Sequence, residues 1–172
     1  MNARSTIFVI CAFVAGTIVL PLGALLVSLL GWMPADAVST PPVWESEIGQ
    51  RALQASLERR SAGLVNPIKG SDAELLAGMQ LFRDGCSGCH GDEGAVSHWG
   101  NSNFYPRVPQ FAQNPPSLST PEMFIAVKYG IRYSGMFANK PMPEKDVWQV
   151  VTFLSRLNSL PPAVNKAWRA KH

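Results

Sequence analysis

Two cysteines and a histidine within five residues constrain this chain more than any other feature. The segment Cys86-Ser87-Gly88-Cys89-His90 places two thiols three positions apart and an imidazole directly after the second thiol. This spacing is typical of covalent haem attachment, because two thiols one helical turn apart can each form a thioether with a haem vinyl group while the imidazole reaches the iron. The motif therefore predicts one covalent haem c, attached through Cys86 and Cys89 and ligated by His90.

Two other kinds of site use paired cysteines, and the surrounding sequence disfavours both. A thioredoxin-like motif follows a strand, whereas the residues before Cys86 have helical periodicity. A structural zinc site needs a second pair of ligands. The chain has only three cysteines, and the remaining one, Cys11, lies in an apolar run. Haem attachment is therefore the interpretation that we keep.

An apolar run near the N-terminus is the second constraint. No charged residue lies between Arg4 and Asp36, and residues 7–33 are almost continuously apolar. A helix of about 24 residues spans roughly 36 Å, enough to cross the hydrocarbon core of a bilayer. A cleaved signal peptide is the alternative, with residues 35–37 as the cleavage site, but its apolar region usually has only about 7–15 residues. We expect a retained anchor that contacts membrane lipid through residues 7–33.

The charges on either side of this run predict its orientation. Arg4 and the terminal amine precede it, whereas Asp36, Glu45 and Glu47 follow it before the first basic residue, Arg51. The positive-inside rule then places the N-terminus in the cytoplasm and the rest of the chain outside. We expect a single-pass protein of the cytoplasmic (inner) membrane with its haem domain in the periplasm, where haem is attached to such motifs.

Composition divides the chain into four segments. Residues 1–33 are predicted to be a cytoplasmic N-terminus and anchor helix, and residues 34–66 a proline-rich linker followed by an amphipathic helix. Residues 67–160 contain the haem motif and three helical patterns, and residues 161–172 form a basic C-terminal tail. Because no repeat is present, we expect one haem domain. The predicted fold class is all-α, with a transmembrane helix and about three to five helices around one haem.

Capping patterns predict where the helices begin. Ser71, with a glutamate three residues later, is typical of a capping box. Thr120, followed by Pro121, is expected to cap a helix that ends at Gly130. The last helix is expected to begin at Pro143.

The sixth iron ligand has to come from another part of the chain. Met136 lies in a glycine-rich loop between the last two helical patterns, and Met142 lies just before the last one. His98 is a third candidate, although its closeness to the haem motif favours a surface position. Met79 and Met123 lie within helical patterns and are expected in the core. A thioether ligand favours Fe(II) and raises the reduction potential relative to a second histidine.

The segment from about residue 66 to residue 160 resembles the class I c-type cytochromes, in particular the small monohaem domains of membrane-bound respiratory complexes. The resemblance is carried by LFRDGCSGCHG at 81–91, VKYGIRYSGM at 127–136 and VTFL at 151–154. It implies that Met136 is the axial ligand. The family often has proline after that methionine, whereas here the Met-Pro pair is Met142-Pro143, and Met142 therefore remains an alternative.

The same resemblance implies two packing features. Gly78 and Phe82 match the family's glycine and aromatic pair, with Phe153 as the aromatic partner on the last helix, and the glycine lets the two helices approach closely. In the family, a proline carbonyl accepts a hydrogen bond from Nδ1 of the proximal histidine and orients its ring. Pro106 and Pro109 are the candidates here, and Pro109 is preferred.

The stretch between the haem motif and the next helix is expected to be irregular and to surround the haem. Its aromatic residues are expected to line the haem pocket: Trp99, Phe104, Tyr105 and Phe111. Arg107 and Arg132 are either partners of the haem propionates or solvated surface residues.

These features predict an electron carrier that is not itself an enzyme. If histidine and methionine fill both axial positions, the iron has no open position for a substrate, and no small-molecule substrate is expected. The partners are expected to be redox proteins, most simply other subunits of a respiratory or dehydrogenase complex. The scattered basic residues form no stripe for nucleic acid, at a net charge of +3.

Two alternatives to a relay subunit remain. The protein can be a free tethered shuttle that carries electrons between membrane complexes. A haem enzyme or gas sensor with an open distal site is the third hypothesis, and it requires that neither Met136 nor Met142 binds the iron.

Overall fold

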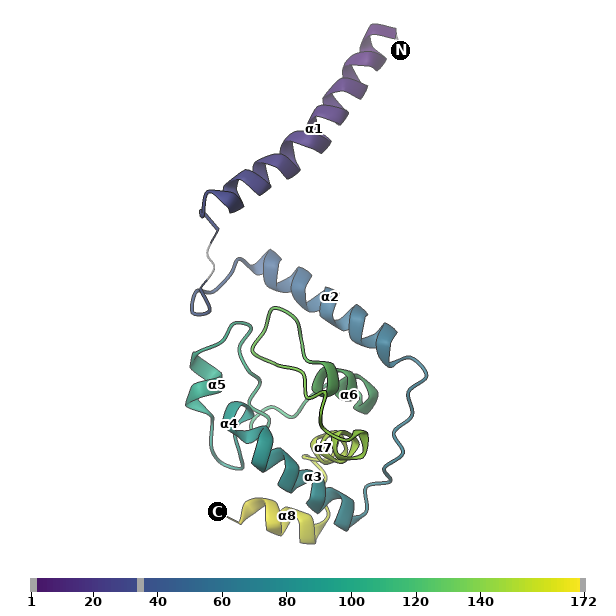
Figure 1. Ribbon diagram of the computed structural model, residues 1–172, viewed down its shortest axis with the longest axis vertical. Helices are drawn as coiled ribbons and strands as arrows, with labels where there is room; N and C mark the ends of the chain where they lie inside the picture. Colours follow the sequence, from purple (N-terminus) through teal and green to yellow (C-terminus); the bar gives the residue numbers. More distant parts are fainter. Residues whose placement is uncertain (1–2, 34–35, 171–172) are drawn as a thin grey trace. The chain divides into compact units, whose positions relative to one another are not determined.

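The computed structural model describes residues 3–33 and 36–170, and these residues are helical with no β-strand (Figure 1). The chain divides into an N-terminal unit, up to Asp36, and a C-terminal unit from Ala37 onwards. The helices are α1 (Ala3–Leu29), α2 (Val43–Ser61), α3 (Asp72–Gly85), α4 (Ser87–His90), α5 (His98–Ser102), α6 (Thr120–Tyr129), α7 (Glu144–Ser155) and α8 (Pro162–Arg169). The predicted all-α fold class is confirmed.

Helix α1 makes up most of the N-terminal unit. Its segment Arg4–Leu29 is long and apolar enough to cross a membrane, by length and composition. The predicted linker continues from this unit into α2, and its first two residues, 34 and 35, lie outside the described residues.

The centre of the C-terminal unit is the packing of α3 against α7. Gly78 on α3 makes the contact possible, because a Cβ atom there would collide with the carbonyl oxygen of Gln149 and lie 3.0 Å from Cβ of Phe153. The rings of Phe82 and Phe153 are fully buried, with centroids 6.1 Å apart. The expected packing of a glycine and two aromatic residues is therefore present.

Helices α6 and α2 add two further layers to this centre. The rings of Phe124 on α6 and Trp148 on α7 stack with centroids 4.2 Å apart. Helix α2 lies on α6 with Leu57 buried. The Gln54 amide of α2 donates to the Glu122 carboxylate of α6 over 2.9 Å. The amphipathic segment predicted after the linker is thus an integral layer of the unit.

The capping predictions have different outcomes at the two helices. The Ser71 capping box is confirmed, because its hydroxyl accepts from the Glu74 N–H and its own N–H donates to the Glu74 carboxylate. The prediction that Thr120 caps α6 is wrong, because Ser119 is the cap residue and its N–H donates to the Glu122 carboxylate over 2.8 Å. A capping box needs a carboxylate on the third residue after the cap, and Ser119, not Thr120, has that spacing to Glu122.

The C-terminal segment is a docked helix, so the expectation of a merely basic tail is wrong for α8. Val164 and Trp168, four residues apart, share one side of this helix and are both buried. The Trp168 ring meets the rings of Phe82 and Phe153 with centroids 6.0 and 5.2 Å away. Helix α8 therefore completes the aromatic core, whereas residues 171 and 172 lie outside the described residues.

Candidate haem site

The haem motif makes one helical turn at the end of α3. The backbone N–H groups of Cys89 and His90 both donate to the carbonyl of Cys86, over 3.1 and 3.0 Å. This turn, α4, separates the two thiols by about one helical turn. Both cysteines are free and partly buried. The local geometry is thus the one that thioether formation with two vinyl groups requires.

The electrostatics of this turn differ from those of a thiol redox site. Burial, and to a lesser extent the neighbouring Cys89, raise the pKa of the Cys86 thiol to about 11. Reactive thioredoxin-like cysteines instead have a lowered pKa, which makes them thiolates near neutral pH. The structure therefore adds a physical argument against the thiol redox alternative.

The His90 imidazole is oriented from two sides. Its Nδ1 lies 2.9 Å from the carbonyl oxygen of Pro109, and the Phe111 ring is parallel to it at a centroid distance of 4.4 Å. Because a carbonyl only accepts, this contact places the proton on Nδ1 and leaves the lone pair on Nε2. Burial lowers the pKa of His90 and favours this neutral form, with the Pro109 hydrogen bond acting in the opposite direction. A neutral imidazole with this tautomer is the form that binds iron.

The segment that follows the motif folds back over it. The Ser97 hydroxyl donates to the carbonyl of Gly88 over 2.5 Å, and the Phe111 N–H donates to the carbonyl of His90 over 3.1 Å. On α5, Gly100 lies so close to the carbonyl of Cys89 that a Cβ atom would collide with it. The stretch expected to be irregular therefore contains one short helix that packs against the haem motif.

Met136 lies in a loop with a tightly defined backbone. The Ile131 N–H donates to the carbonyl of Met136 over 2.9 Å, and the Met136 N–H donates to the Ser134 hydroxyl over 3.1 Å. At the start of the loop, Gly130 has a φ of 70°, and a Cβ atom there would lie 2.8 Å from the Met136 carbonyl oxygen. The loop can double back at this point because the residue there is glycine.

This loop meets the segment around the motif through Phe104. A Cβ atom on Gly135 would lie 2.8 Å from Cε1 of Phe104, so the loop backbone rests on that ring. Phe104 in turn packs edge-on against Trp99 of α5, with centroids 5.7 Å apart. Contacts therefore run from the residue before Met136 to the helix that touches the haem motif.

Met142 is held at a different place. Its carbonyl accepts a hydrogen bond from Nζ of Lys128 over 2.6 Å, near the end of α6, and its N–H donates to the carbonyl of Asn139. The side chains of Met136 and Met142 are both partly buried against the hydrophobic core. Backbone contacts thus connect the loop of Met136 to the segment around the motif, whereas those of Met142 run to Lys128 and Asn139.

The remaining sequence candidates have varied positions. His98 is exposed at the start of α5, as expected of a surface residue, and Met79 and Met123 are buried in the core. The Arg107 guanidinium donates to the carbonyls of Ser102, Phe104 and Val38. Trp99, which was expected to line the pocket, is 60 % exposed and packs edge-on against Phe104.

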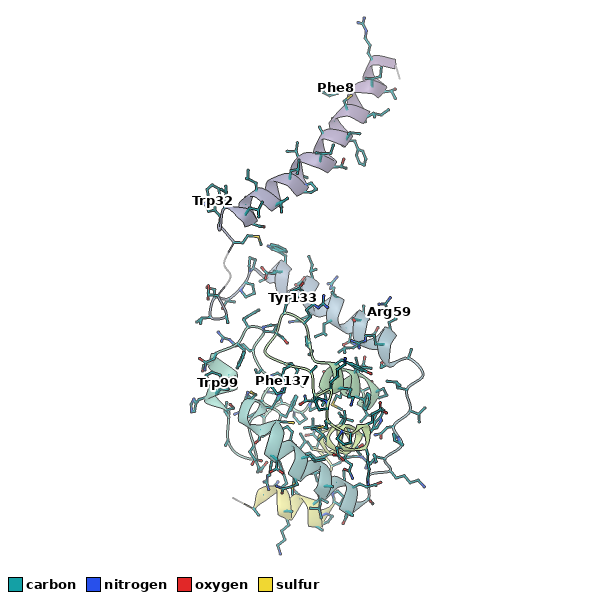
Figure 2. The ribbon with its side chains drawn as sticks, in the orientation of Figure 1. Phe8, Trp32, Arg59, Trp99, Tyr133 and Phe137 are labelled. Atoms are coloured by element: carbon teal, nitrogen blue, oxygen red, sulfur yellow. The ribbon has the colours of Figure 1, made fainter. Side chains whose placement is uncertain are left out.

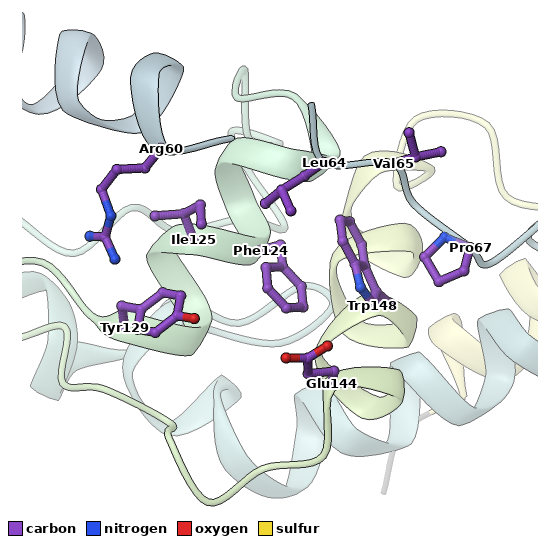
Figure 3. A pocket seen from close by; sticks show the side chains of 9 residues that line it. All are labelled: Arg60, Leu64, Val65, Pro67, Phe124, Ile125, Tyr129, Glu144 and Trp148. Carbon is purple, nitrogen blue, oxygen red and sulfur yellow. The ribbon is translucent and has the colours of Figure 1, made fainter. Parts of the chain in front are cut away.

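A separate hollow of about 510 Å³ lies between α2, α6 and α7 (Figure 3). The Arg60 guanidinium carbon stands 4.8 Å from the centroid of the Tyr129 ring on one side of it. Its lining residues are Arg60, Leu64, Val65, Pro67, Phe124, Ile125, Tyr129, Glu144 and Trp148. None of these is a predicted haem ligand, so the hollow belongs to the packing of α2 and not to the motif.

The donor set at the motif fits haem and does not fit a bare metal ion. Among the described residues, no group of three His, Cys, Asp or Glu side chains converges on one point. A protein-bound transition metal without a macrocycle usually takes three or four such ligands. A porphyrin supplies four nitrogens itself, so one imidazole and one further ligand suffice. Two thiols and a neutral imidazole on one turn therefore match haem c.

A comparison with known families agrees with this geometry. The model of the family described as cytochrome c oxidase, cbb3-type, subunit III matches residues 73–154, from the first turn of α3 to the end of α7. These residues form a class I c-type cytochrome domain. The cytochrome domain binds one covalent haem c. No curated protein and no solved structure matches the chain.

Two residues that matter for the cytochrome domain escaped the sequence-based prediction. Arg83, whose side chain is 7 % exposed, pairs with Asp92 over 3.2 Å and donates to the carbonyl of Trp168 over 2.6 Å. Gln110 is buried and bonds to the carbonyl of Cys89. Arg83 and Asp92 do flank the motif in the sequence, but no local pattern indicates their distant partners.

Proposed function

We propose that this protein is a membrane-anchored monohaem electron carrier that works as a relay subunit of a respiratory or dehydrogenase complex. Cys86 and Cys89 would hold the haem through two thioethers, and His90 and Met136 would bind its iron. The observation that carries the proposal is the single turn of the motif with Nδ1 of His90 held by Pro109, inside a cytochrome domain. When bound, the haem iron cycles between Fe(III) and Fe(II) and so accepts and donates one electron.

The residues around the proposed site would hold and orient the iron ligands. The Pro109 carbonyl keeps the proton on Nδ1 of His90 and makes the imidazole a stronger electron donor. Phe111 stacks on that imidazole and restricts its rotation. If His90 and Met136 both bind the iron, it would have no open position for a substrate, and this favours electron transfer over catalysis or gas sensing.

Met136 is the better candidate for the distal ligand. Its loop rests on Phe104, whose ring contacts the helix packed on the motif. The carbonyl of Met142 is instead tied to Lys128 at the end of α6. A methionine on the loop that contacts the segment packed on the motif is therefore the one we assign to the iron.

The proposal of a membrane anchor is supported by the composition of α1 and by the charges that flank it. The helix has the length and apolar composition of a single membrane span. Arg4 before it and the acidic residues after it favour a cytoplasmic N-terminus and a periplasmic cytochrome domain. This orientation also matches the compartment in which haem c is attached.

An exposed apolar strip on α2 supports a relay subunit. Trp44 and Ile48 are 61 and 62 % exposed, whereas Leu57 of the same helix is buried against the domain. Leu53 is partly buried against the hydrophobic core. Trp44 lies nine residues before Leu53, about 180° around the helix, so the strip points away from that core. Such a strip is a natural contact for another subunit. A tethered shuttle is the alternative, favoured by the division of the chain into two units.

A native gel of membranes solubilised in mild detergent separates these two forms. The gel is stained for haem, and the stained band is analysed by mass spectrometry. A relay subunit runs in a high-mass band with companion subunits, whose identity names the reaction. A shuttle runs alone near the size of one chain plus detergent, and that result would replace the relay proposal.

A further inference from the structure

Gln110 is a buried polar side chain beside the haem motif, and its amide is fully engaged. Its Oε1 accepts from the Ser97 N–H over 2.8 Å, and its Nε2 donates to the carbonyls of Cys89 and Val108, each over 3.0 Å. The partners fix the orientation of the amide, because the opposite orientation would place the amide nitrogen against an N–H group and the amide oxygen against two carbonyls. Only 7 % of the residue is exposed.

Three consecutive residues bind the haem motif at this point. The Pro109 carbonyl faces Nδ1 of His90, the Gln110 side chain bonds to the carbonyl of Cys89, and the Phe111 N–H donates to the carbonyl of His90. Proline has no N–H, so the Pro109 peptide has fewer bonds of its own to hold it. Its position relative to the imidazole therefore depends on the anchors on either side.

Gly91 makes room for this arrangement. A Cβ atom at Gly91 would lie 2.9 Å from Oε1 of Gln110 and 2.6 Å from the carbonyl oxygen of Ala95. Its φ of 76° is also one that other residues rarely adopt. Any larger residue at position 91, directly after the proximal histidine, would therefore crowd the Gln110 amide.

We propose that Gln110 is a positioning residue that holds the Pro109 carbonyl against Nδ1 of His90 and thereby sets how strongly His90 donates electrons to the iron. This inference rests on the proposed function, because it assumes that His90 is the proximal ligand. A strong hydrogen bond from Nδ1 gives the imidazole partial imidazolate character and stabilises Fe(III). Loosening that bond therefore raises the reduction potential.

The test uses the full-length holoprotein with Gln110→Leu, which keeps the volume but removes all three hydrogen bonds. The readouts are the reduction potential from a redox titration and the exchange rate of the His90 Nδ1 proton with D₂O in the reduced protein, followed by NMR. We expect a higher potential and an exchange rate at least about tenfold faster, because opening of the Pro109 contact exposes the proton. The optical spectrum remains that of a low-spin haem with two axial ligands.

Leu57→Ala is the matched control for a purely structural effect. Leu57 is buried between α2 and α6, so its truncation lowers the melting temperature without touching residues 109–111. We expect this variant to keep the wild-type potential and exchange rate. If Gln110→Leu likewise lowers the melting temperature but leaves the potential and the exchange rate unchanged, the inference is wrong.

Gln110→Glu gives an independent test if the leucine variant does not retain haem. It preserves the shape and an acceptor for Ser97 but cannot donate to the two carbonyls when ionised. Faster exchange of the Nδ1 proton supports the inference, and wild-type exchange overturns it. A wild-type protein whose haem lacks a histidine ligand would instead overturn the proposed function itself.

Discussion

At the scale of single residues, the proposed haem site depends on which atoms of His90 and of the candidate ligand Met136 would face the iron. The carbonyl of Pro109 determines this for His90, because it places the proton on Nδ1. For Met136, the folded-back loop between Gly130 and Phe137 determines the position of the backbone. Substitutions at the two methionines therefore separate the candidate ligands.

Met136→His is expected to keep a six-coordinate, low-spin haem and to lower the reduction potential, because imidazole stabilises Fe(III) more than a thioether does. Met136→Ala is expected to abolish the weak far-red charge-transfer band of ferric iron bound to methionine. Optical spectra and redox titrations of the purified holoprotein measure both effects. Met142→Ala is the control and keeps the band, whereas loss of the band only in this variant would make Met142 the ligand.

Glu122 is a second residue whose environment has a measurable consequence. Hydrogen bonds from the hydroxyl and N–H of Ser119 lower the pKa of its carboxyl below the usual glutamate value. Since the pKa is lower in the folded state, the carboxylate stabilises the fold above the unfolded-state value and loses this contribution as the pH falls through the folded-state value. Protonation of the Glu122 carboxylate is therefore expected to contribute to acid unfolding.

Glu122→Gln is expected to flatten the dependence of unfolding free energy on pH below about pH 4.5, the region in which the carboxyl titrates. Urea unfolding at a series of pH values, followed by circular dichroism, measures the slope. Gln54→Leu serves as the comparison: it removes a weaker hydrogen bond to the same carboxylate, keeps those of Ser119, and is expected to flatten the slope less. An equal slope for wild type and Glu122→Gln would show that the capping box contributes nothing in acid.

At the scale of elements, α8 is the part of the fold that the local sequence patterns describe least well. Arg83 joins it to both flanks of the motif, because its guanidinium pairs with Asp92 and donates to the carbonyls of Ala167 and Trp168. The guanidinium carbon of Arg83 also lies 5.0 Å from the centroid of the Trp168 ring. The Arg83 side chain therefore links the residues just before and just after the haem motif to α8.

Arg83→Met is expected to lower the unfolding free energy by about 2 kcal/mol, because it leaves Asp92 without its ion pair and two carbonyls without their donor. It is also expected to make the C-terminus more sensitive to protease. Chemical denaturation and limited proteolysis of the holoprotein measure these effects. Arg169→Met on the exposed side of α8 is the matched control, with an expected change within about 0.5 kcal/mol; equal effects of both variants would contradict this role of Arg83.

At the scale of the whole molecule, charge is unevenly distributed around the haem site. One segment, residues 94–121, follows the motif, and another, residues 123–143, contains Met136. Neither segment contains an acidic residue. Their basic residues are Arg107, Lys128, Arg132 and Lys140. Two haem propionates offset part of this charge. The exposed side chains of Trp99, Tyr133 and Phe137 belong to the same segments, whereas Arg59 lies on α2 (Figure 2).

Oxidation of the reduced protein by ferricyanide, an anion, is expected to slow as ionic strength rises, because salt screens the basic segments. Arg132→Glu is expected to slow it by about threefold or more at low salt. Stopped-flow absorbance of the haem measures the rate. Arg59→Glu changes the net charge equally on α2 and is expected to have a smaller effect; equal effects of the two variants would mean that net charge alone controls the rate.

Several features of this protein followed from the sequence because they depend on neighbours along the chain. The haem motif is a matter of spacing within one helical turn, and the span of α1 depends on a run of apolar residues. The capping box at Ser71 needs residues only three positions apart. The wrong cap at Thr120 shows the limit of such patterns, because two adjacent hydroxyl residues compete and only one has the required spacing to Glu122.

Other features depend on contacts between distant residues, and only the tertiary structure decided them. Pro109 rather than Pro106 faces His90 because residues 109–111 bind the motif, and Gln110 and Arg83 find their partners only in the folded chain. The burial of Trp168 could not be predicted from the basic C-terminal segment, because it depends on contacts with Phe82 on α3 and Phe153 on α7. Local spacing thus determined the chemistry of the motif, whereas long-range packing determined what orients and surrounds it.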